Sequence, residues 1–217
     1  KKYNIPKICI GGGVGLNVKL NSKIFNLEEV NDFFAHPLCG DSGAACGSAL
    51  LANFKDTKIK PEKLSTLAIG LEETDKEIEK TLKLSKIEYN KEKNIASKVA
   101  HLLDKGYVVG WVQGRMEAGP RALGQRSILA NPKNINYRDK VNQIIKFRED
   151  WRPFCPSILE EFASIYFDKY THAPFMIISF NANEKLCNDA PAIVHIDGTS
   201  RVQLVNKRNN PLYHKMI

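Results

Sequence analysis

The chain has 217 residues, 43% of them hydrophobic, and carries a formal net charge of +8. This composition excludes a disordered chain and is compatible with one large domain or two small ones. No apolar run approaches the roughly 18 residues that cross a bilayer, so no membrane partner is expected. The positive charge is dispersed without a block of like charge, which argues against a nucleic-acid partner.

The five cysteines are scattered along the chain, and no two of them form a C-x-x-C pair. An odd number without metal-type spacing argues against a zinc ribbon or a disulfide framework. The cysteines therefore predict reduced thiols and a cytoplasmic location.

The first half of the chain is typical of an α/β segment with two glycine-rich turns. A short strand over 8–10 leads into the turn GGGVGLN and a helix over 18–25. A second turn, GDSG, precedes the small-residue helix AACGSALLANF. The capping box TDKE predicts a helix over about 75–84, and a further helix over 95–103 stops at the next glycine.

The second half has the texture of a mixed α+β unit. Its apolar runs YVVGWV, SILA, FMIISF, AIVHI and VQLVN predict strands, with helices near 137–146 and 159–167. A turn is expected at the Asp197–Gly198 pair. We place the boundary between the halves between about 60 and 95, where the chain is polar and irregular.

Each glycine-rich turn follows the order turn, then helix, that suits anion binding. Free N–H groups at a helix start point outward, and glycine lets a phosphate approach closely. In the first turn Asn17 could bond a ribose or a base, and in the second Asp41 could hold a divalent cation that bridges phosphates. The alternative is that these glycines only permit tight turns and close packing. Both interpretations stay open.

Guanidinium groups are confined to the second half of the chain. All eight arginines lie at or after position 115, whereas lysine is the surface cation elsewhere. The arginine fork binds phosphate and carboxylate oxygens in pairs and stays charged at any working pH. Six of these arginines fall in three loop-like segments, GRMEAGPRALGQRS, KFREDWRPFCPS and HIDGTSR. If the segments converge, they form one pocket for a polyanion.

The alternative for each single arginine is an ion pair with an acid close in sequence. Glu117, Glu149, Asp150 and Asp197 are the available carboxylates. For the whole set we favour a phosphate site, because the arginines are so unevenly distributed. His195, taken alone, is more typical of a structural histidine than of a catalytic one.

The same segments resemble a known family. GRMEAGPRALGQRSILANP, KFREDWRPFCPSIL and APAIVHIDGTSRVQLV are similar to signature segments of the O-carbamoyltransferases that modify Nod factors, cephems and aminoglycoside antibiotics. GGVGLN and GDSGAACGSAL resemble two turns of that family's preceding domain, and LAIGLEETDKEIEKTL resembles its interdomain segment. The resemblance covers nearly the whole chain.

The resemblance implies a fold in two parts. Residues 1–60 would be the C-terminal tail of an actin-like (ASKHA-type) nucleotide- and metal-binding domain, and residues 61–94 the interdomain segment. Residues 95–217 would be a YrdC-like α+β domain with a mixed twisted sheet, truncated at its C-terminus. A fragment of this extent is not expected to be fully active alone.

The resemblance also implies a reaction and its partners. The YrdC-like part is taken to join carbamoyl phosphate and ATP into carbamoyl-adenylate. The actin-like part would pass the carbamoyl group to a hydroxyl of a sugar or natural-product acceptor. ATP and a divalent metal, Fe or Mg, are the implied cofactors, and a homodimer is compatible with the resemblance.

The resemblance assigns roles residue by residue. The implied catalytic residues are Arg115, Arg148, Arg152 and His195. The implied ligands of carbamoyl phosphate and the adenylate are Arg121, Arg126, Ser127 and Arg201. The implied nucleotide-binding residues are Gly12, Gly13, Asn17, Gly40 and Gly43, and the implied metal ligand is Asp41.

Three other functions stay open on the sequence. A threonylcarbamoyl-tRNA-type RNA modification or RNA-binding protein would show strongly salt-dependent tRNA binding, although no RNA motif is visible. A hydrogenase-maturation carbamoylation would be expected to carry zinc-finger cysteine pairs, which the sequence lacks. A non-catalytic nucleotide sensor is the third alternative.

Overall fold

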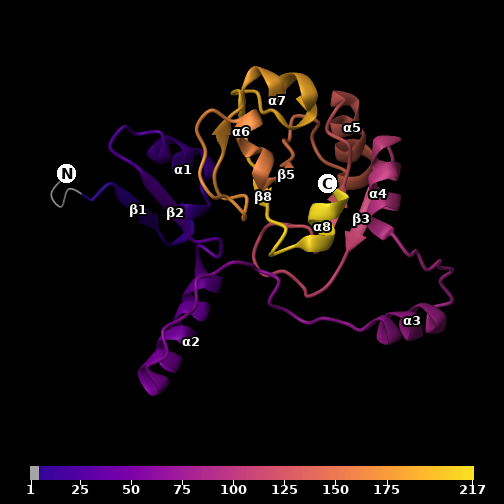
Figure 1. Cartoon of the computed structure of the whole chain (residues 1–217), viewed down its shortest axis with the longest axis horizontal. Coiled ribbons are helices and arrows are strands. Elements are labelled where there is room, and N and C mark those ends of the chain that lie inside the picture. Colours follow the sequence, from indigo (N-terminus) through magenta and orange to yellow (C-terminus); the bar gives the residue numbers. More distant parts are fainter. Residues whose placement is uncertain (1–4) are drawn as a thin grey trace.

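The computed structural model describes residues 5–217, which form a mixed α/β fold with several short sheets (Figure 1). The first unit contains the parallel strands β1 (Lys7–Ile10) and β2 (Asp32–Ala35), joined through the helix α1 (Val18–Phe25). The glycine turn between β1 and α1 forms a short 3-10 helix, η1 (Gly13–Leu16). The predicted strand and helix are confirmed. Strand β2 was not predicted, because its four residues directly precede a turn that contains a proline.

Three further helices follow the predicted pattern. They are α2 (Asp41–Thr57), α3 (Asp75–Leu84) and α4 (Ile95–Asp104). The expected capping box is present at the start of α3, where the Thr74 hydroxyl and the Glu77 carboxylate each bond the other residue's backbone N–H. Helix α2 buries none of its residues and projects away from the rest of the chain (Figure 1).

The second half forms short strand pairs in place of the single mixed sheet that we expected. Strands β3 and β4 pair antiparallel, β5 and β8 pair parallel, and β6 and β7 pair antiparallel. Their bounds are Val109–Val112 for β3, Arg126–Leu129 for β4, Ser157–Leu159 for β5, Phe180–Asn181 for β6, Thr199–Ser200 for β7 and Gln203–Val205 for β8.

Two of the predicted strands are largely wrong. In FMIISF the side chains are buried, but only Phe180 enters a strand, because Met176 adopts a left-handed backbone with φ 55° that interrupts an extended run. A continuous apolar run shows burial without fixing the backbone conformation. The first two residues of AIVHI instead belong to the 3-10 helix η4 (Pro191–Ile193), which begins at a proline as such turns favour. The expected turn at Gly198 is confirmed, with φ 73°.

The expected helices of the second half are present but divided. The first consists of α5 (Ile135–Lys140), which continues directly into the π-helical turn η2 (Val141–Lys146). The second consists of the 3-10 turn η3 (Glu160–Phe162) and α6 (Ala163–Tyr166). The remaining described helices are α7 (Glu184–Asp189) and α8 (Pro211–Met216).

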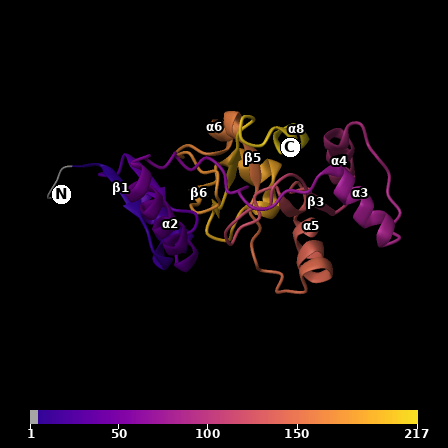
Figure 2. The same ribbon diagram turned by 90° about the horizontal axis from the view of Figure 1, so that it is seen from below.

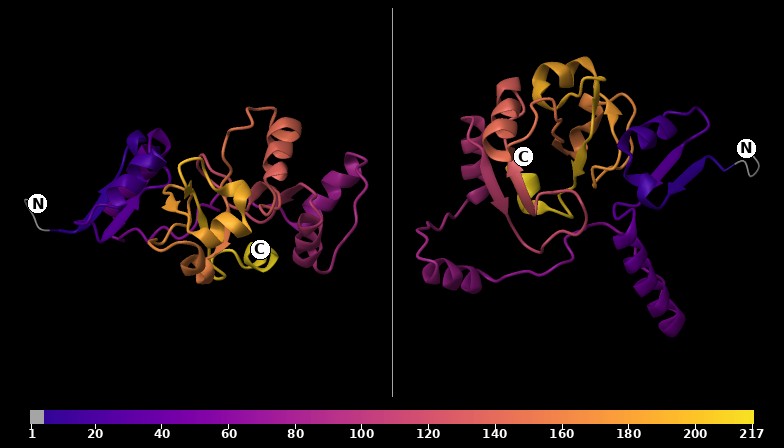
Figure 3. Two further views of the ribbon diagram at one scale, coloured as in Figure 1. Left: turned by 90° about the horizontal axis from the view of Figure 1, so that it is seen from above. Right: turned by 180° about the vertical axis from the view of Figure 1, so that it is seen from behind.

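One hydrophobic core joins the N-terminal unit to the second half. It includes Phe25 and Phe33 from the first unit together with Phe180 and Leu204 from the second. The ring of Phe180 meets the rings of Phe25 and Phe167 edge to face, at centroid distances of 5.9 and 5.5 Å. Figures 2 and 3 show the first unit at one end of the molecule and α3 with α4 at the other.

A buried amide on α1 adds a polar link between the same two parts. Asn21 is fully buried, and its Nδ2 donates to the carbonyl oxygens of Gly15 and Ile177, at 2.7 Å each. The glycine turn is thereby tied to the buried run of the second half. Buried carbonyl groups that lose such a donor are costly.

We therefore predict that Asn21→Ala lowers the free energy of unfolding by about 1–3 kcal/mol, because two buried carbonyls lose their donor. Urea-induced unfolding followed by circular dichroism measures this change. Asn26→Ala, at an exposed position just after α1, is the matched control and should change stability by less than about 0.5 kcal/mol. Equal stability of the two variants would contradict the assigned link.

Candidate anion-binding site

The loop GRMEAGPRALGQRS connects β3 to β4 and is organised around one carboxylate. Glu117 accepts hydrogen bonds from the backbone N–H groups of Leu123, Gln125 and Arg126, at 2.7, 3.3 and 2.9 Å. Gly124, at φ 92°, packs against the Tyr213 ring, where a Cβ would clash. The carboxylate therefore holds the loop in a curved conformation that depends on glycine.

Two of the predicted ligand-binding residues also stabilise this loop. The Arg126 guanidinium donates to the backbone carbonyls of Gln113 at 2.8 Å and Gly114 at 3.2 Å. The Ser127 hydroxyl accepts a hydrogen bond from the Gly124 N–H at 3.0 Å. The predicted catalytic Arg115 is exposed and donates to the carbonyl of Ile69 at 3.3 Å.

Three other arginines meet around Cys155. Arg201 donates from Nε to the Cys155 sulfur at 2.7 Å. Burial raises the pKa of the Cys155 thiol, and the positive charges of Arg201, Arg121 and Arg148 oppose that rise. Because the charges of all three arginines act on one thiol, Arg121, Arg148 and Arg201 lie near one another, whereas Arg115 and Arg126 bond backbone carbonyls. Cys155 itself was not a predicted site residue, although it lies within the KFREDWRPFCPS segment.

The cluster concentrates positive charge in a partly buried place. Burial lowers the pKa of Arg121, and the charge of Arg201 lowers it further. Burial likewise lowers the pKa of Arg148, with Arg152 as the next cause. Arginine still stays charged at neutral pH. The lowered pKa values therefore mean that an added anion would be stabilised here.

The nearby carboxylates are engaged elsewhere. Among residues 5–217, only Arg152 of the six predicted site arginines has an ion pair, with Glu149 at 2.8 Å. Glu117 holds backbone N–H groups, as described above. Asp150 accepts from Gln143 at 3.0 Å, and Asp197 pairs with Lys19 at 3.0 Å. The alternative of arginines neutralised one by one is therefore not what the structure contains.

Two polar atoms near the cluster are buried and have no hydrogen-bond partner among the described residues. They are Nε of Arg121 and Nε2 of His195. Burial lowers the pKa of His195, and the charges of Arg201 and Lys19 act in the same direction, while a backbone hydrogen bond with Phe154 and the charge of Asp197 oppose them, so the neutral form of the ring is favoured. Its Nδ1 lies 3.3 Å from the Thr199 hydroxyl. Buried polar atoms without partners mark places where a ligand or water is expected.

An open cavity of about 880 Å³ adjoins this cluster. Its wall includes Phe154 and Cys155 from the arginine-bearing loop, together with Tyr137 from α5 and Ile193 from η4. The size falls in the range of small-molecule sites. The cavity and the cluster share Cys155, so a ligand could extend from one into the other.

The glycine turns show a mixture of the two expected roles. Gly12 and Gly40 have φ of 79° and 112°, and no atom lies within 4 Å of a Cβ built on either of them or on Gly13. Gly43 packs against the carbonyl of Leu38, where a Cβ would clash, which is a packing role. The Asn17 side chain caps α1 by accepting from the Leu20 N–H at 3.0 Å.

The expected metal ligand, Asp41, does not form a complete metal site by itself among the described residues. Asp41 is the exposed first residue of α2. Residues 5–217 contain no group of three or more histidine, cysteine, aspartate or glutamate side chains that could hold a metal ion. A single carboxylate does not satisfy Mg²⁺ or Fe by itself. No step proposed below goes through a metal.

Chemically, three neighbouring arginines without carboxylate partners are a candidate binding site for a small anion of the phosphate or carboxylate class. Comparison with known proteins adds the family. The family model described as carbamoyltransferase C-terminus matches residues 100–217, more than half of the chain. The model described as carbamoyltransferase N-terminus matches residues 1–50. The chain belongs to the carbamoyltransferase family, which confirms the resemblance noted in the sequence.

Individual relatives are similar over nearly the whole chain. The nodulation protein NolO of Bradyrhizobium diazoefficiens is 38% identical over 224 residues, which cover 100% of this chain and 41% of NolO. The 3′-hydroxymethylcephem-O-carbamoyltransferase of Amycolatopsis lactamdurans is 35% identical over 212 residues, covering 97% of this chain and 39% of that enzyme. The chain thus spans about two fifths of the length of these curated relatives. Within residues 5–217, no helix has the length and apolar character to cross a membrane.

We predict that Glu117→Gln destabilises the loop between β3 and β4. Either orientation of the amide directs its NH₂ group at a backbone N–H that now donates to the carboxylate. The cost should be about 1–3 kcal/mol in the free energy of unfolding, measured in urea. Glu62→Gln, at an exposed position, is the matched control. Unchanged stability of the Glu117 variant would remove the carboxylate from its assigned role.

We predict that Asp197 makes a pH-dependent contribution to the free energy of unfolding. Hydrogen bonds from Thr199, helped by Lys19, lower the pKa of Asp197 to about 2. A carboxyl with a lowered pKa contributes stability above its ordinary value of 3.8 and loses it as the pH falls toward 2. Asp197→Asn should therefore lower the unfolding free energy by about 1 kcal/mol or less at pH 7. At pH 2 the difference from wild type should shrink, and a difference that grows on acidification would refute the assignment.

Proposed function

We propose that the protein provides the carbamoyl-phosphate-activating part of an ATP-dependent O-carbamoyltransferase. The observation that carries this proposal is the convergence of Arg121, Arg148 and Arg201 without a carboxylate partner for any of them among residues 5–217. Membership of the carbamoyltransferase family supports carbamoyl as the transferred group. The chain spans about two fifths of the length of its curated relatives, so the proposal for this chain is limited to the activation step.

The proposed chemistry balances in two stages, the formation of carbamoyl-adenylate by hydrolysis and adenylation and the transfer of the carbamoyl group. With one water, carbamoyl phosphate yields carbamate and phosphate, and a carbamate oxygen then attacks the α-phosphorus of ATP. The bond from that phosphorus to pyrophosphate breaks, which gives carbamoyl-adenylate. An acceptor hydroxyl next attacks the carbamoyl carbon, AMP leaves, and the hydroxyl proton passes to solvent.

The arginines would act by positioning and by electrostatics. In the first stage charge develops on phosphate and pyrophosphate, and fixed guanidinium groups offset it without moving. The exposed ion pair of Arg152 with Glu149 is weak enough for a bound phosphate to replace it. The neutral His195 ring offers Nε2 as a hydrogen-bonding atom toward the ligand. The nucleoside would occupy the adjoining cavity.

The glycine turn of the first unit would bind a second nucleotide, and the carbamoyl group would pass to the acceptor hydroxyl near it. Gly12 and Gly13 leave open space at the start of η1, which a phosphate could approach. The acceptor is proposed as a hydroxyl-bearing small molecule, because the name of one relative, the 3′-hydroxymethylcephem-O-carbamoyltransferase, states such an acceptor.

We predict that Arg148→Ala or Arg152→Ala abolishes carbamoyl-phosphate-dependent ATP–pyrophosphate exchange in the full-length enzyme. Each removes a charge-assisted contact to a phosphate, which should lower exchange at least about 100-fold. Arg208→Ala removes an exposed arginine outside the cluster and is the matched control. Exchange that survives in the first two variants would exclude them from the site.

A further inference from the structure

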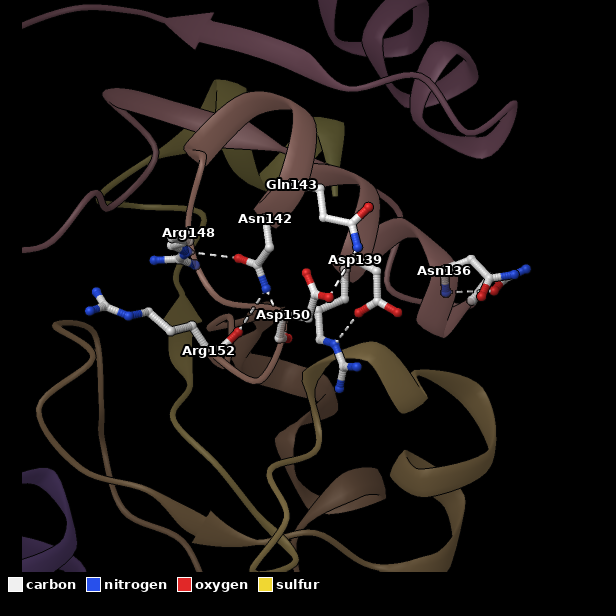
Figure 4. Close-up of polar contacts among 9 residues, drawn as sticks. Asn136, Asp139, Asn142, Gln143, Arg148, Asp150 and Arg152 are labelled. Carbon is white, nitrogen blue, oxygen red and sulfur yellow. Dashed lines mark hydrogen bonds and ion pairs between the residues drawn. The ribbon is translucent and has the colours of Figure 1, made fainter.

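Asn142 contacts both arginines of the KFREDWRPFCPS segment, the side chain of Arg148 and the backbone of Arg152. It is fully buried, and its Oδ1 accepts from Nε of Arg148 at 2.7 Å. Its Nδ2 donates to the backbone carbonyls of Asp150 and Arg152, at 3.1 Å each (Figure 4). One side chain therefore uses both of its donor protons and its acceptor on a single loop.

The backbone around Asn142 explains how one side chain reaches so much of the loop. Its carbonyl accepts from the N–H groups of Phe147 and Arg148, which closes the wide turn η2. Phe147 then adopts a left-handed backbone with φ 49°, so the chain reverses direction over Asn142. In Figure 4 the side chains of Arg148 and Arg152 extend to the same side of this loop. π-Helical turns are frequently found at functional sites.

The contact to Arg148 fixes a guanidinium without neutralising it. An amide oxygen accepts from Nε but carries no net charge. The Phe154 ring, whose centroid lies 4.6 Å from the guanidinium carbon, supports the same group, also without a charge. Arg148 is thus held in place by neutral partners, and its positive charge is kept for a ligand.

Other side chains of similar size could not do the same. A carboxylate at position 142 would neutralise Arg148 and would set an oxygen against the carbonyls of Asp150 and Arg152. An alanine would leave the two carbonyls and the Arg148 Nε without partners. The amide therefore serves both needs: it bonds the loop carbonyls, and it leaves the charge of Arg148 uncompensated.

We propose that Asn142 is a positioning residue for the anion site: it orients Arg148 and the loop bearing Arg152 while leaving the charge of Arg148 uncompensated. This inference rests on the proposed function, because it assigns Arg148 to the binding of a phosphate group. Asn142 acts through Arg148 and does not itself contact the ligand.

The test compares Asn142→Asp and Asn142→Ala in the full-length protein, with inorganic phosphate as the probe and titration calorimetry as the measurement. Loss of a hydrogen bond to a charged group should weaken phosphate binding about tenfold in Asn142→Ala. Asn142→Asp should weaken it further, because its carboxylate neutralises Arg148. In steady-state exchange assays the KM for carbamoyl phosphate should rise in both variants, with kcat and the KM for ATP changing much less.

Two controls separate positioning from a general loss of fold. Gln143→Ala removes the contact from the same turn to the Asp150 side chain, and Asn136→Ala alters an exposed amide on α5 (Figure 4). Both should bind phosphate within about twofold of wild type. A merely structural role would make phosphate affinity follow thermal stability across all of these variants, and that correlation would overturn the inference.

A double-mutant cycle distinguishes failure of this inference from failure of the proposed function. In an Arg148→Ala background, Asn142→Ala should cause a smaller further loss of phosphate affinity than it does in wild type, because Asn142 acts in part through Arg148. If Arg148→Ala abolishes binding while Asn142→Ala leaves it intact, the positioning role is wrong and the anion site stands. If wild type binds no phosphate and Arg148→Ala changes nothing, both the site and the role of Asn142 are overturned.

Discussion

The central constraint of the structure is that positively charged arginine side chains lie close together in a partly buried place. Arg121, Arg148 and Arg201 all act on one thiol, and burial with mutual repulsion lowers the pKa of Arg121 and Arg148. Such an arrangement is unfavourable by itself, because each charge loses water and meets another of the same sign. The hydrophobic core shared by the two halves of the chain holds the arrangement in place. A bound anion would relieve the repulsion, which is the physical basis of the anion site that we propose.

Arg126, Arg148 and Arg201 have neutral hydrogen-bond partners, which leave their positive charges uncompensated. Arg126 bonds backbone carbonyls, Arg148 bonds the amide of Asn142, and Arg201 bonds the Cys155 sulfur. Carboxylates that are close in sequence are engaged with other groups: Glu117 with backbone N–H groups and Asp197 with Lys19. The same acids that made the ion-pair alternative reasonable are thus part of the scaffold. Sequence proximity between opposite charges did not indicate which atoms they contact.

The sequence predicted elements whose signals are local. The capping box at Thr74 gave the first residue of α3, and the glycine turn gave α1. The strand predicted over FMIISF was wrong, because its apolar side chains are buried without an extended backbone. The convergence of the arginines was predicted from composition, whereas the separate roles of Arg115 and Arg126 were not, since they depend on which carbonyls lie nearby. Asn142 could not be found, because nothing local marks an amide that meets a loop folding back on it.

Helix α1 connects the glycine turn to the second half of the chain through its side chains. Asn21 bonds the Gly15 carbonyl of the glycine turn and the Ile177 carbonyl of the buried run. Lys19, near the start of the same helix, pairs with Asp197 in the turn that follows His195. The helix is short and its N-cap, Asn17, lies in the glycine turn itself. A displacement of that turn would therefore have to break the Asn21 bonds or move the His195 turn with it, so the geometry of the glycine turn and of the arginine pocket is set together.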